Sequence, residues 1–307
     1  MRTNVALLVG GTDGIGRATA VKLAARGVRV VLVGRNAEKG ERAAAEVRSR
    51  GGAADVLRAD VSLMAEVRRL AEEVKSRYSR LDLLIHSADV LRLKREKTAE
   101  GLEVAFATNY LSRFLLNHLL LDLLKAGAPA RVLHVAAAGF PGKLDLANVP
   151  PDRGTSSFTG HNIGQRANDV YGVEPAERLR DTGVTVNIMN PGMVATDIRR
   201  SVPGGGALAR AIELVSKPVT KTPGAFAERV LHLALAPELA GVSGALFGPS
   251  GKRLRVRAAV LDPALRRGLW RASERLVGLG AARDRGPAEP PRRELDAPTG
   301  NTFRASR

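Results

Sequence analysis

Six short apolar runs alternate with longer segments of helical pattern, and this alternation constrains the fold more than any other feature. The runs are mostly continuous, which is typical of strands covered on both faces. They span residues 4–10, 28–34, 53–59, 81–87, 130–137 and 184–190, and the helical segments between them span 14–27, 36–52, 62–78, 100–127 and 161–183. Strict alternation of strand and helix predicts a doubly wound α/β fold of the Rossmann type, with a parallel sheet and right-handed crossovers.

One domain is expected to occupy residues 1–280. The late run 244–249 is short enough to add only an edge strand. Residues 201–220 interrupt the pattern with a Pro- and Gly-rich entry and a short amphipathic stretch, so we predict a small substrate lid there. Residues 281–307 are rich in Pro and charge without periodicity, which predicts a disordered tail.

Composition excludes several classes of site and location. The chain has 307 residues and no cysteine, so disulfides, thiolate nucleophiles and Cys-ligated metals are excluded, and no metal site is expected. No apolar run approaches the ~18 residues that cross a bilayer. The first apolar run, Val5 to Val9, is too short for a signal peptide. We therefore expect a cytoplasmic protein that spans no membrane.

The charge of the chain is strongly positive, at a formal +17. Its basic residues are interspersed with acidic ones along the predicted helices, as expected of solvated faces. Aromatic residues make up only 4%, so stacking platforms for bases are scarce. We expect no nucleic-acid partner, and a positive field that favours anionic cofactors or small-molecule substrates.

A glycine-rich turn connects the first strand to the first helix. In "LLVGGTDGIGRATA", Gly10 permits the tight turn, Gly14 lets backbone approach a pyrophosphate, and Gly16 lets the helix pack against the strand. The helix N-terminus then faces the phosphates. This arrangement predicts a dinucleotide site.

The end of the second strand indicates which dinucleotide is bound. Arg35 lies where an acidic residue would bond a free ribose hydroxyl, and an Arg there accommodates a 2′-phosphate instead. Arg17 offers a second cation, so NADP(H) is favoured over NAD(H). Asp60 and Val61 are predicted at the adenine edge, although Asp60 also fits the N-cap of the next helix. The predicted cofactor contacts are Gly10, Thr12, Asp13, Gly14, Ile15, Gly16, Arg17, Arg35, Asp60, Val61, Ser87, Ala88, Gln165, Pro191, Gly192, Val194 and Thr196.

On these motifs the chain resembles the short-chain dehydrogenases/reductases, in particular the retinol-dehydrogenase-like branch. The family's Thr-Gly-x-x-x-Gly-x-Gly appears as "VGGTDGIG", with Val9 in place of Thr. Its Asp-Val is Asp60-Val61, and its Pro-Gly after the sixth strand is Pro191-Gly192, followed by Thr196. The resemblance spans residues 4 to about 250 and implies a nicotinamide-dependent oxidoreductase.

The same resemblance implies a changed catalytic centre. The family protonates a ketone with Tyr, lowers the pKa of that Tyr with Lys four residues later, positions the carbonyl with Ser and holds a water with Asn. Asn109 retains the Asn, but the Ser position falls at Ala137, the Tyr position at His161 and the Lys position at Gln165. The family's Asn-Asn-Ala-Gly is "HSAD", with Asp89 in place of the last Gly. Asn109 and His161 are the candidate catalytic residues. For His161 the alternative is a neutral residue that only shapes the pocket.

We predict an atypical NADPH-dependent ketoreductase in which the substrate supplies the proton, for example an aromatic ketone beside a phenol. The chain is similar in this respect to atypical ketoreductases that tailor aromatic (angucyclinone-type) polyketides, which implies a role in antibiotic or other secondary metabolism. Two alternatives remain open. One is a non-redox cyclase or isomerase that uses His161 as acid or base. The other is an NADP(H)-binding pseudoenzyme.

The oligomeric state is left open by the sequence. The family often associates through two long helices, here 98–126 and 161–181. Gly172 and Pro175 interrupt the second, because a proline kinks or breaks a regular helix. A monomer or an unusual dimer is expected.

Overall fold

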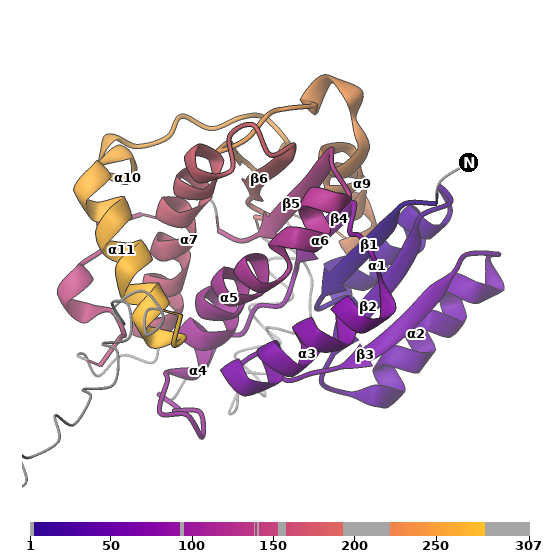
Figure 1. Ribbon diagram of the computed structural model, residues 1–307, viewed down its shortest axis with the longest axis horizontal. Coiled ribbons are helices and arrows are strands. Elements are labelled where there is room, and N and C mark those ends of the chain that lie inside the picture. The colour runs from indigo at the N-terminus through magenta and orange to yellow at the C-terminus, as the bar shows by residue number, and fades with distance from the viewer. Residues whose placement is uncertain are drawn as a thin grey trace, which may run out of the picture.

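A computed structural model describes residues 3–92, 95–137, 139, 141–152, 158–192 and 222–279. Its seven strands form one parallel sheet in the order β3-β2-β1-β4-β5-β6-β7 (Figure 1). The strands are β1 (Val5–Val9), β2 (Arg29–Gly34), β3 (Ala54–Arg58), β4 (Leu83–His86), β5 (Ala130–Val135), β6 (Val184–Met189) and β7 (Leu246–Phe247). The predicted doubly wound fold is confirmed. The predicted edge strand is β7, which pairs in parallel with β6.

Helices cover both faces of this sheet. They are α1 (Gly14–Ala24), α2 (Ala37–Ser49), α3 (Met64–Arg77), α4 (Val104–Phe106), the π-helical turn η1 (Ala107–Leu111), α5 (Ser112–Leu119), α6 (Leu121–Ala126), α7 (Phe158–Arg178), α9 (Pro223–Leu235), α10 (Ala258–Leu261) and α11 (Pro263–Leu276), with short 3₁₀ turns η2 (Leu146–Asn148) and η3 (Pro237–Leu239). Several helices begin at residues with side-chain N-caps. Asn36 accepts a bond from Lys39 N, and Thr222 caps α9 directly before Pro223.

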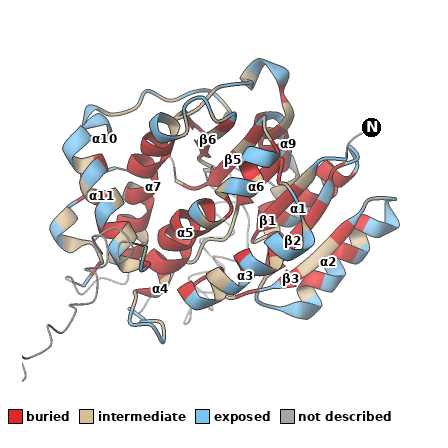
Figure 2. Ribbon diagram, in the orientation of Figure 1, coloured by how far each residue is buried: buried red, intermediate tan, exposed pale blue. Residues whose placement is uncertain are grey.

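Successive strand residues point to opposite faces and divide the core in two. Leu7 and Val9 pack with α3, α5, α7 and α11, whereas Ala6 and Leu8 pack with α1, α2 and α9. Figure 2 shows the strands and inner helix faces buried and the outer helix faces exposed. A sheet buried on both faces explains why the strand runs are continuously apolar.

The first of the two long helical segments is not the regular helix that its pattern predicts. Residues 100–127 contain α4, the π turn η1, α5 and α6 in succession. The π turn holds Asn109, and such insertions are frequent at functional sites. One extra residue per turn re-aims the side chains that follow, which a regular helical period cannot anticipate.

The prediction that Gly172 and Pro175 interrupt the next helix is wrong, because α7 runs through both residues. Pro175 lies in the last turn, where its missing N–H removes a single bond and the carbonyl of Pro175 still accepts from Leu179 N at 2.8 Å. Gly172 packs on β6, where a Cβ would lie 2.4 Å from Ile188 Cδ1.

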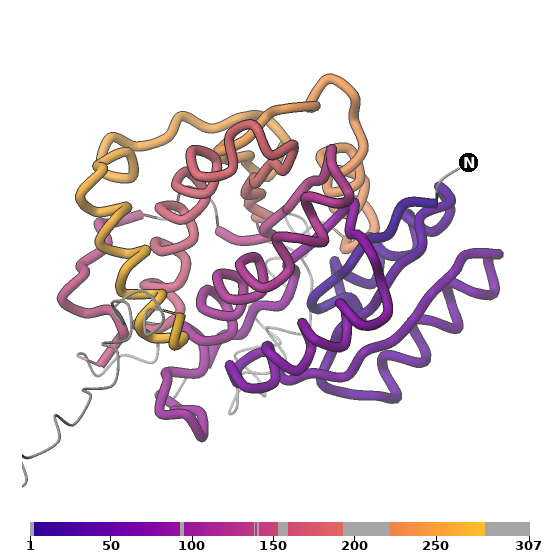
Figure 3. The backbone as a smooth tube through the Cα atoms, in the orientation of Figure 1, coloured from indigo at the N-terminus to yellow at the C-terminus, as the bar shows by residue number. Residues whose placement is uncertain are grey.

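The C-terminal helices fold back onto α7 and η1 (Figure 3). Tyr110 of η1 and Ser273 of α11 share a buried hydrogen bond of 2.7 Å. Arg266 of α11 bonds Glu177 of α7 at 2.6 Å, and Arg178 lies 3.9 Å above the Trp270 ring. One side of the two long helices is therefore already covered by the chain itself.

None of the helices that the structure describes is both long and apolar enough to cross a bilayer. The predicted lid at 201–220 and the predicted tail at 281–307 lie outside the described residues.

Candidate active site

The turn between β1 and α1 leaves no room for a side chain at two of its glycines. Gly10 has a φ of +82°, and a Cβ there would lie 2.5 Å from Ala88 N. A Cβ on Gly16 would lie 2.1 Å from the carbonyl oxygen of Gly10. The carbonyl of Val9 accepts from the N–H groups of Ser87 and Ala88. The turn is thus built against the end of β4, and the N-terminus of α1 lies at the carboxyl edge of the sheet.

The side chains of this turn hold its backbone. Asp13 caps α1, because its Oδ1 accepts from Gly14 N at 2.8 Å. Thr12 fills the space above Gly34, where a Cβ would lie 2.5 Å from Thr12 Oγ1. Ile15 is buried in the core. A turn of this shape fits a pyrophosphate, which binds backbone N–H groups at a helix N-terminus.

Cations gather beside the turn, where the adenosine ribose of a dinucleotide would lie. Arg35 and Arg17 are each more than half exposed, at 55% and 52%. Arg35 lies 3.7 Å from Asp60, and Arg17 lies 3.6 Å from Glu46. Lys39, which the sequence analysis missed, contacts Asp13 at 2.6 Å. The sequence signal for Lys39 was its position in the first turn of the helix that follows Arg35.

Asp60 organises the turn after β3. Its Oδ1 accepts from Ser62 N at 3.0 Å and from Ser62 Oγ at 2.8 Å. The alternative role as a helix N-cap is wrong, since α3 is preceded at that position by Leu63, which has no side-chain cap. Val61 is buried beside it.

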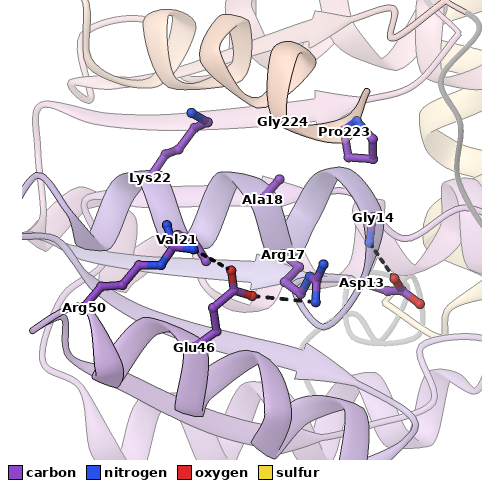
Figure 4. Close-up of a pocket in the computed structure, with 10 residues that line it drawn as sticks. All are labelled: Asp13, Gly14, Arg17, Ala18, Val21, Lys22, Glu46, Arg50, Pro223 and Gly224. Carbon is purple, nitrogen blue, oxygen red and sulfur yellow. Dashed lines mark hydrogen bonds and ion pairs between the residues drawn. The ribbon is translucent and has the colours of Figure 1, made fainter. Parts of the chain in front are cut away.

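A half-open cavity of about 410 Å³ runs from the glycine turn along the outer face of α1 (Figure 4). Arg17 and Arg50 flank Glu46, which lies 3.6 Å from the first and 3.2 Å from the second. Asp13 and Gly14 line one end of the cavity, and Pro223 and Gly224 of α9 line another part. Neither candidate catalytic residue borders it, so the cavity reaches the phosphate end of the predicted site but not its chemistry.

The candidate catalytic residues Asn109 and His161 lie together. Asn109 Oδ1 accepts from Val90 N at 2.8 Å, and its Nδ2 donates to Val90 O at 2.9 Å. The same Nδ2 lies 3.2 Å from His161 Nδ1. Asn168 Nδ2 donates to the backbone carbonyl of Asn109 at 2.9 Å and joins α7 to the π turn. The resemblance-based placement of His161 opposite Asn109 is consistent with this geometry.

Gln165 bonds the two other positions that the resemblance singles out, Ala137 and Asp89. Its Oε1 accepts from Ala137 N at 2.9 Å, and its Nε2 donates to Asp89 Oδ2 at 2.8 Å. The side chain is almost fully buried. Both ends of the amide are thus engaged within the protein, which leaves the second Nε2 hydrogen and the second lone pair of Oε1 for the predicted cofactor contact.

A buried cation lies behind these residues. Arg113 of α5 is 1% exposed, and its Nη2 donates to Ala88 O at 2.9 Å and to Val135 O at 3.1 Å. Burial lowers the pKa of Arg113 to about 10, and the charge of Asp89 opposes that shift. The sequence analysis missed this residue, although one Arg inside the apolar run "SRFLLNHLLL" was a visible signal.

Two buried histidines form a neutral layer below the site. His86 Nε2 lies 2.8 Å from Asn117 Oδ1, and Asn117 Nδ2 lies 3.0 Å from His134 Nε2. Burial, and next the charge of Arg113, lower the pKa of His86 to about 3. Burial likewise lowers the pKa of His134 well below its usual range. His86 is therefore a packing residue, and it does not contact the candidate catalytic residues.

No tyrosine lies at the candidate site, and all three tyrosines of the chain are among the described residues. Tyr78 donates to Asp55, near the amino ends of the strands. Tyr110 bonds Ser273, and Tyr171 accepts from Asn117 Nδ2 in the core. Within the described ranges, no three His, Asp or Glu side chains are grouped as a metal site requires.

The remaining predicted cofactor residues follow β6. Asn190 Oδ1 accepts from Gly192 N at 2.8 Å, and Gly192 has a φ of +63°. Pro191 and Gly192 thus form a turn at the carboxyl edge of the sheet. Val194 and Thr196 lie outside the described residues.

Comparisons with known proteins agree with this architecture. A family model for short chain dehydrogenase matches residues 4–143. Mouse retinol dehydrogenase 14 is 33% identical over 91% of this chain and 87% of its own length. The solved RhlG/NADP active-site complex of Pseudomonas aeruginosa has a TM-score of 0.63 at 25% identity, covering 81% of this chain and 95% of that one.

An actinorhodin polyketide ketoreductase solved with NADPH shares the fold, with a TM-score of 0.63 at 24% identity over 80% of this chain and 95% of that one. At that identity the likeness speaks for the fold alone. The extensive match to retinol dehydrogenase 14 decides the family. The chain belongs to the short-chain dehydrogenases, nicotinamide-dependent oxidoreductases, and is similar to their retinol-dehydrogenase-like members.

Proposed function

We propose that this protein is an NADP(H)-dependent ketoreductase that works without a tyrosine acid. The observation that carries the proposal is a closely packed glycine turn at the same sheet edge as Asn109 and His161, while every tyrosine of the chain lies elsewhere. The oxidoreductase relatives support the reaction class. The NADP in the RhlG complex supports the choice of dinucleotide.

The cations beside the turn favour the phosphorylated cofactor. Arg35, Arg17 and Lys39 are the cations that we propose for the 2′-phosphate, and each is paired with a carboxylate. Their carboxylate partners Asp60, Glu46 and Asp13 hold them there in the absence of a ligand. When bound, NADPH supplies the hydride. The protein supplies the backbone cradle and the orientation.

The substrate we propose is an aromatic ketone of the polyketide type, a product of secondary metabolism, whose own phenol lies beside the carbonyl. Such a phenol shares its proton with the developing alkoxide, so the missing tyrosine costs less. General acid catalysis raises the rate by about 10²- to 10⁴-fold, and positioning of the reacting groups raises it by about 10⁵-fold or more. A centre that still aligns hydride and carbonyl can therefore remain a reductase.

Single-turnover assays with NADPH deuterated at C4 test this proposal. We expect deuterium at the carbinol carbon of a peri-hydroxylated aromatic ketone. Consumption of the substrate without oxidation of the cofactor would instead identify a cyclase or isomerase that uses His161. Tight cofactor binding without any turnover across a ketone panel would identify a pseudoenzyme.

A further inference from the structure

The residues before and after Asp89 in the sequence are both held by hydrogen bonds. The two residues before it are anchored by the carbonyl of Val9, and the residue after it, Val90, is anchored at both backbone groups by Asn109. Gln165 donates to Asp89 Oδ2 at 2.8 Å. Oδ1 is buried, and no hydrogen-bond donor among the described residues reaches it. Oδ1 lies 3.6 Å from His161 Nδ1.

The charge of Asp89 offsets a buried cation. Arg113 bonds two backbone carbonyls, which carry no net charge, and its Nε and Nη1 are buried without a partner among the described residues. Burial lowers the pKa of Arg113, and the charge of Asp89 opposes that shift. A buried cation without a counter-charge is strongly unfavourable, so Asp89 is the counter-charge that we assign to Arg113.

His161 Nδ1 lies near both a hydrogen-bond donor, Asn109 Nδ2, and an acceptor, Asp89 Oδ1. Since Val90 N must donate to Asn109 Oδ1, the amide of Asn109 cannot be flipped, and its Nδ2 faces the ring at 3.2 Å. An unprotonated Nδ1 accepts from this amide. A protonated Nδ1 donates to Asp89 Oδ1 after a small movement of the ring, which closes the 3.6 Å separation.

We propose that Asp89 positions His161 as the proton donor of the reaction, so that an Asp-His pair replaces the tyrosine and lysine of the family. This inference rests on the proposed reductase function. Asp89 is the positioning residue, and His161 is the group that meets the substrate oxygen. Arg113 balances the charge of Asp89, and Gln165 fixes its second oxygen.

The proton balance of the step is simple. A bound reduced nicotinamide would supply the hydride to the carbonyl carbon. The carbonyl oxygen would take its proton from the Nε2 of the His161 imidazolium, directly or through the phenol of the substrate. His161 is left neutral, with Nδ1–H bonded to Asp89. Water then returns a proton to Nε2. Histidine suits this cycle because its imidazole gives and takes protons near neutral pH.

A second carboxylate near His161 provides a matched control. Glu103 precedes α4, and its Oε2 accepts from Phe106 N at 2.6 Å. It packs against Gly160, the residue before His161. Burial raises the pKa of Glu103. Replacing Glu103 with Gln removes the acid but keeps an oxygen for the helix cap.

The decisive experiment records the side-chain ¹⁵N spectrum of His161 in the full chain without cofactor or substrate, with H161Q assigning the signals. At pH 8 we expect the wild type and E103Q to show a protonated Nδ1, and D89N to show a proton on Nε2 and an acceptor Nδ1. An unchanged tautomer in D89N would overturn the proposal, as would an equal change in E103Q. If D89N fails to fold, the double variant D89N/R113M removes both buried charges. It must then show the change of His161 tautomer that is expected for D89N.

Turnover provides the second measurement. We expect D89N to lower kcat by about 10- to 100-fold, with the KM for the ketone and the Kd for NADPH within about twofold. Unchanged kcat in D89N would overturn the Asp-His pair while leaving the reductase function intact. If the wild type turns over no ketone, the proposed function fails, and the spectrum still decides whether Asp89 controls His161.

Discussion

The proposed cofactor half and the proposed catalytic half of this site are formed by different parts of the chain, backbone in the first and side chains in the second. At the β1–α1 turn, the site is backbone held by steric exclusion, and a Cβ at Gly10 or Gly16 would lie within 2.5 Å of main-chain atoms. Around His161 the site is a network of side chains. Asn109 and Asp89 both lie against His161, and Gln165 donates to Asp89. A backbone cradle tolerates few residues at its critical positions, whereas a side-chain network can exchange its members and retain its shape. The difference would explain a first half that keeps the family motif beside a second half that departs from it, as we propose.

The largest effect is expected in the cofactor half. Replacing Gly16 with Val places a side chain where a Cβ already lies 2.1 Å from Gly10 O, so the turn must open. We expect NADPH binding to weaken by more than about 100-fold in calorimetry, about 3 kcal/mol or more. Gly224 borders the same cavity with nothing within 4 Å of a Cβ, so G224A should bind normally. Equal losses in both variants would show that the turn is not the cradle.

In the catalytic half, H161Q should separate chemistry from binding. We expect kcat to fall by about 100-fold, because a general acid is lost. The Kd for NADPH should stay within about twofold of the wild-type value, because the backbone cradle is unchanged. The comparison sharpens if two ketones are used. The loss should be smaller for a ketone with a neighbouring phenol than for one without. A large loss of cofactor affinity in H161Q would break the division into two independent halves.

The histidine layer below the catalytic half should make stability depend on pH. The pKa of folded His86 is about 3, against an ordinary value near 6.5, so the unfolded chain binds more protons between these values and stability falls as pH falls through that window. Between pH 7 and pH 5 we expect His86 to cost about 2 kcal/mol in the free energy of unfolding by urea. H86Q should flatten this dependence. H232Q, at an exposed histidine, should not.

The smallest effect concerns the choice of dinucleotide. Arg35 is more than half exposed, so R35Q should weaken NADPH binding by about 10-fold and leave NADH binding nearly unchanged. R50Q, in the same cavity but at the far end of α2, serves as the control. If NADH weakens as much as NADPH, Arg35 does not recognise a 2′-phosphate.

The fold was predictable because it depends on local patterns that survive in the sequence. The strand runs and the glycine turn were located correctly, since continuous apolar runs and glycine spacing follow directly from burial on both faces and from close backbone approach. The sequence pattern predicts a helical segment over 161–183, but the interruption predicted at Gly172 and Pro175 is wrong. A rule against proline inside helices neglects that Pro175 lies in the last turn, where only one bond is lost.

The catalytic half was predictable only in part. The resemblance placed His161, Gln165 and Asn109 at positions that the fold brings together. The roles of Asp89 and Arg113 could not be read from the sequence, because a loop after β4 and a helix 24 residues later meet only in the folded chain. Neither residue type signals its partner by local spacing.

Calorimetric titration of the wild type and H161Q with NADPH tests the central claim most directly. We expect both proteins to bind the cofactor with dissociation constants that differ by less than about twofold, because the cradle is backbone and does not depend on His161. An absence of binding heat in the wild type would contradict it, and so would binding that disappears with His161.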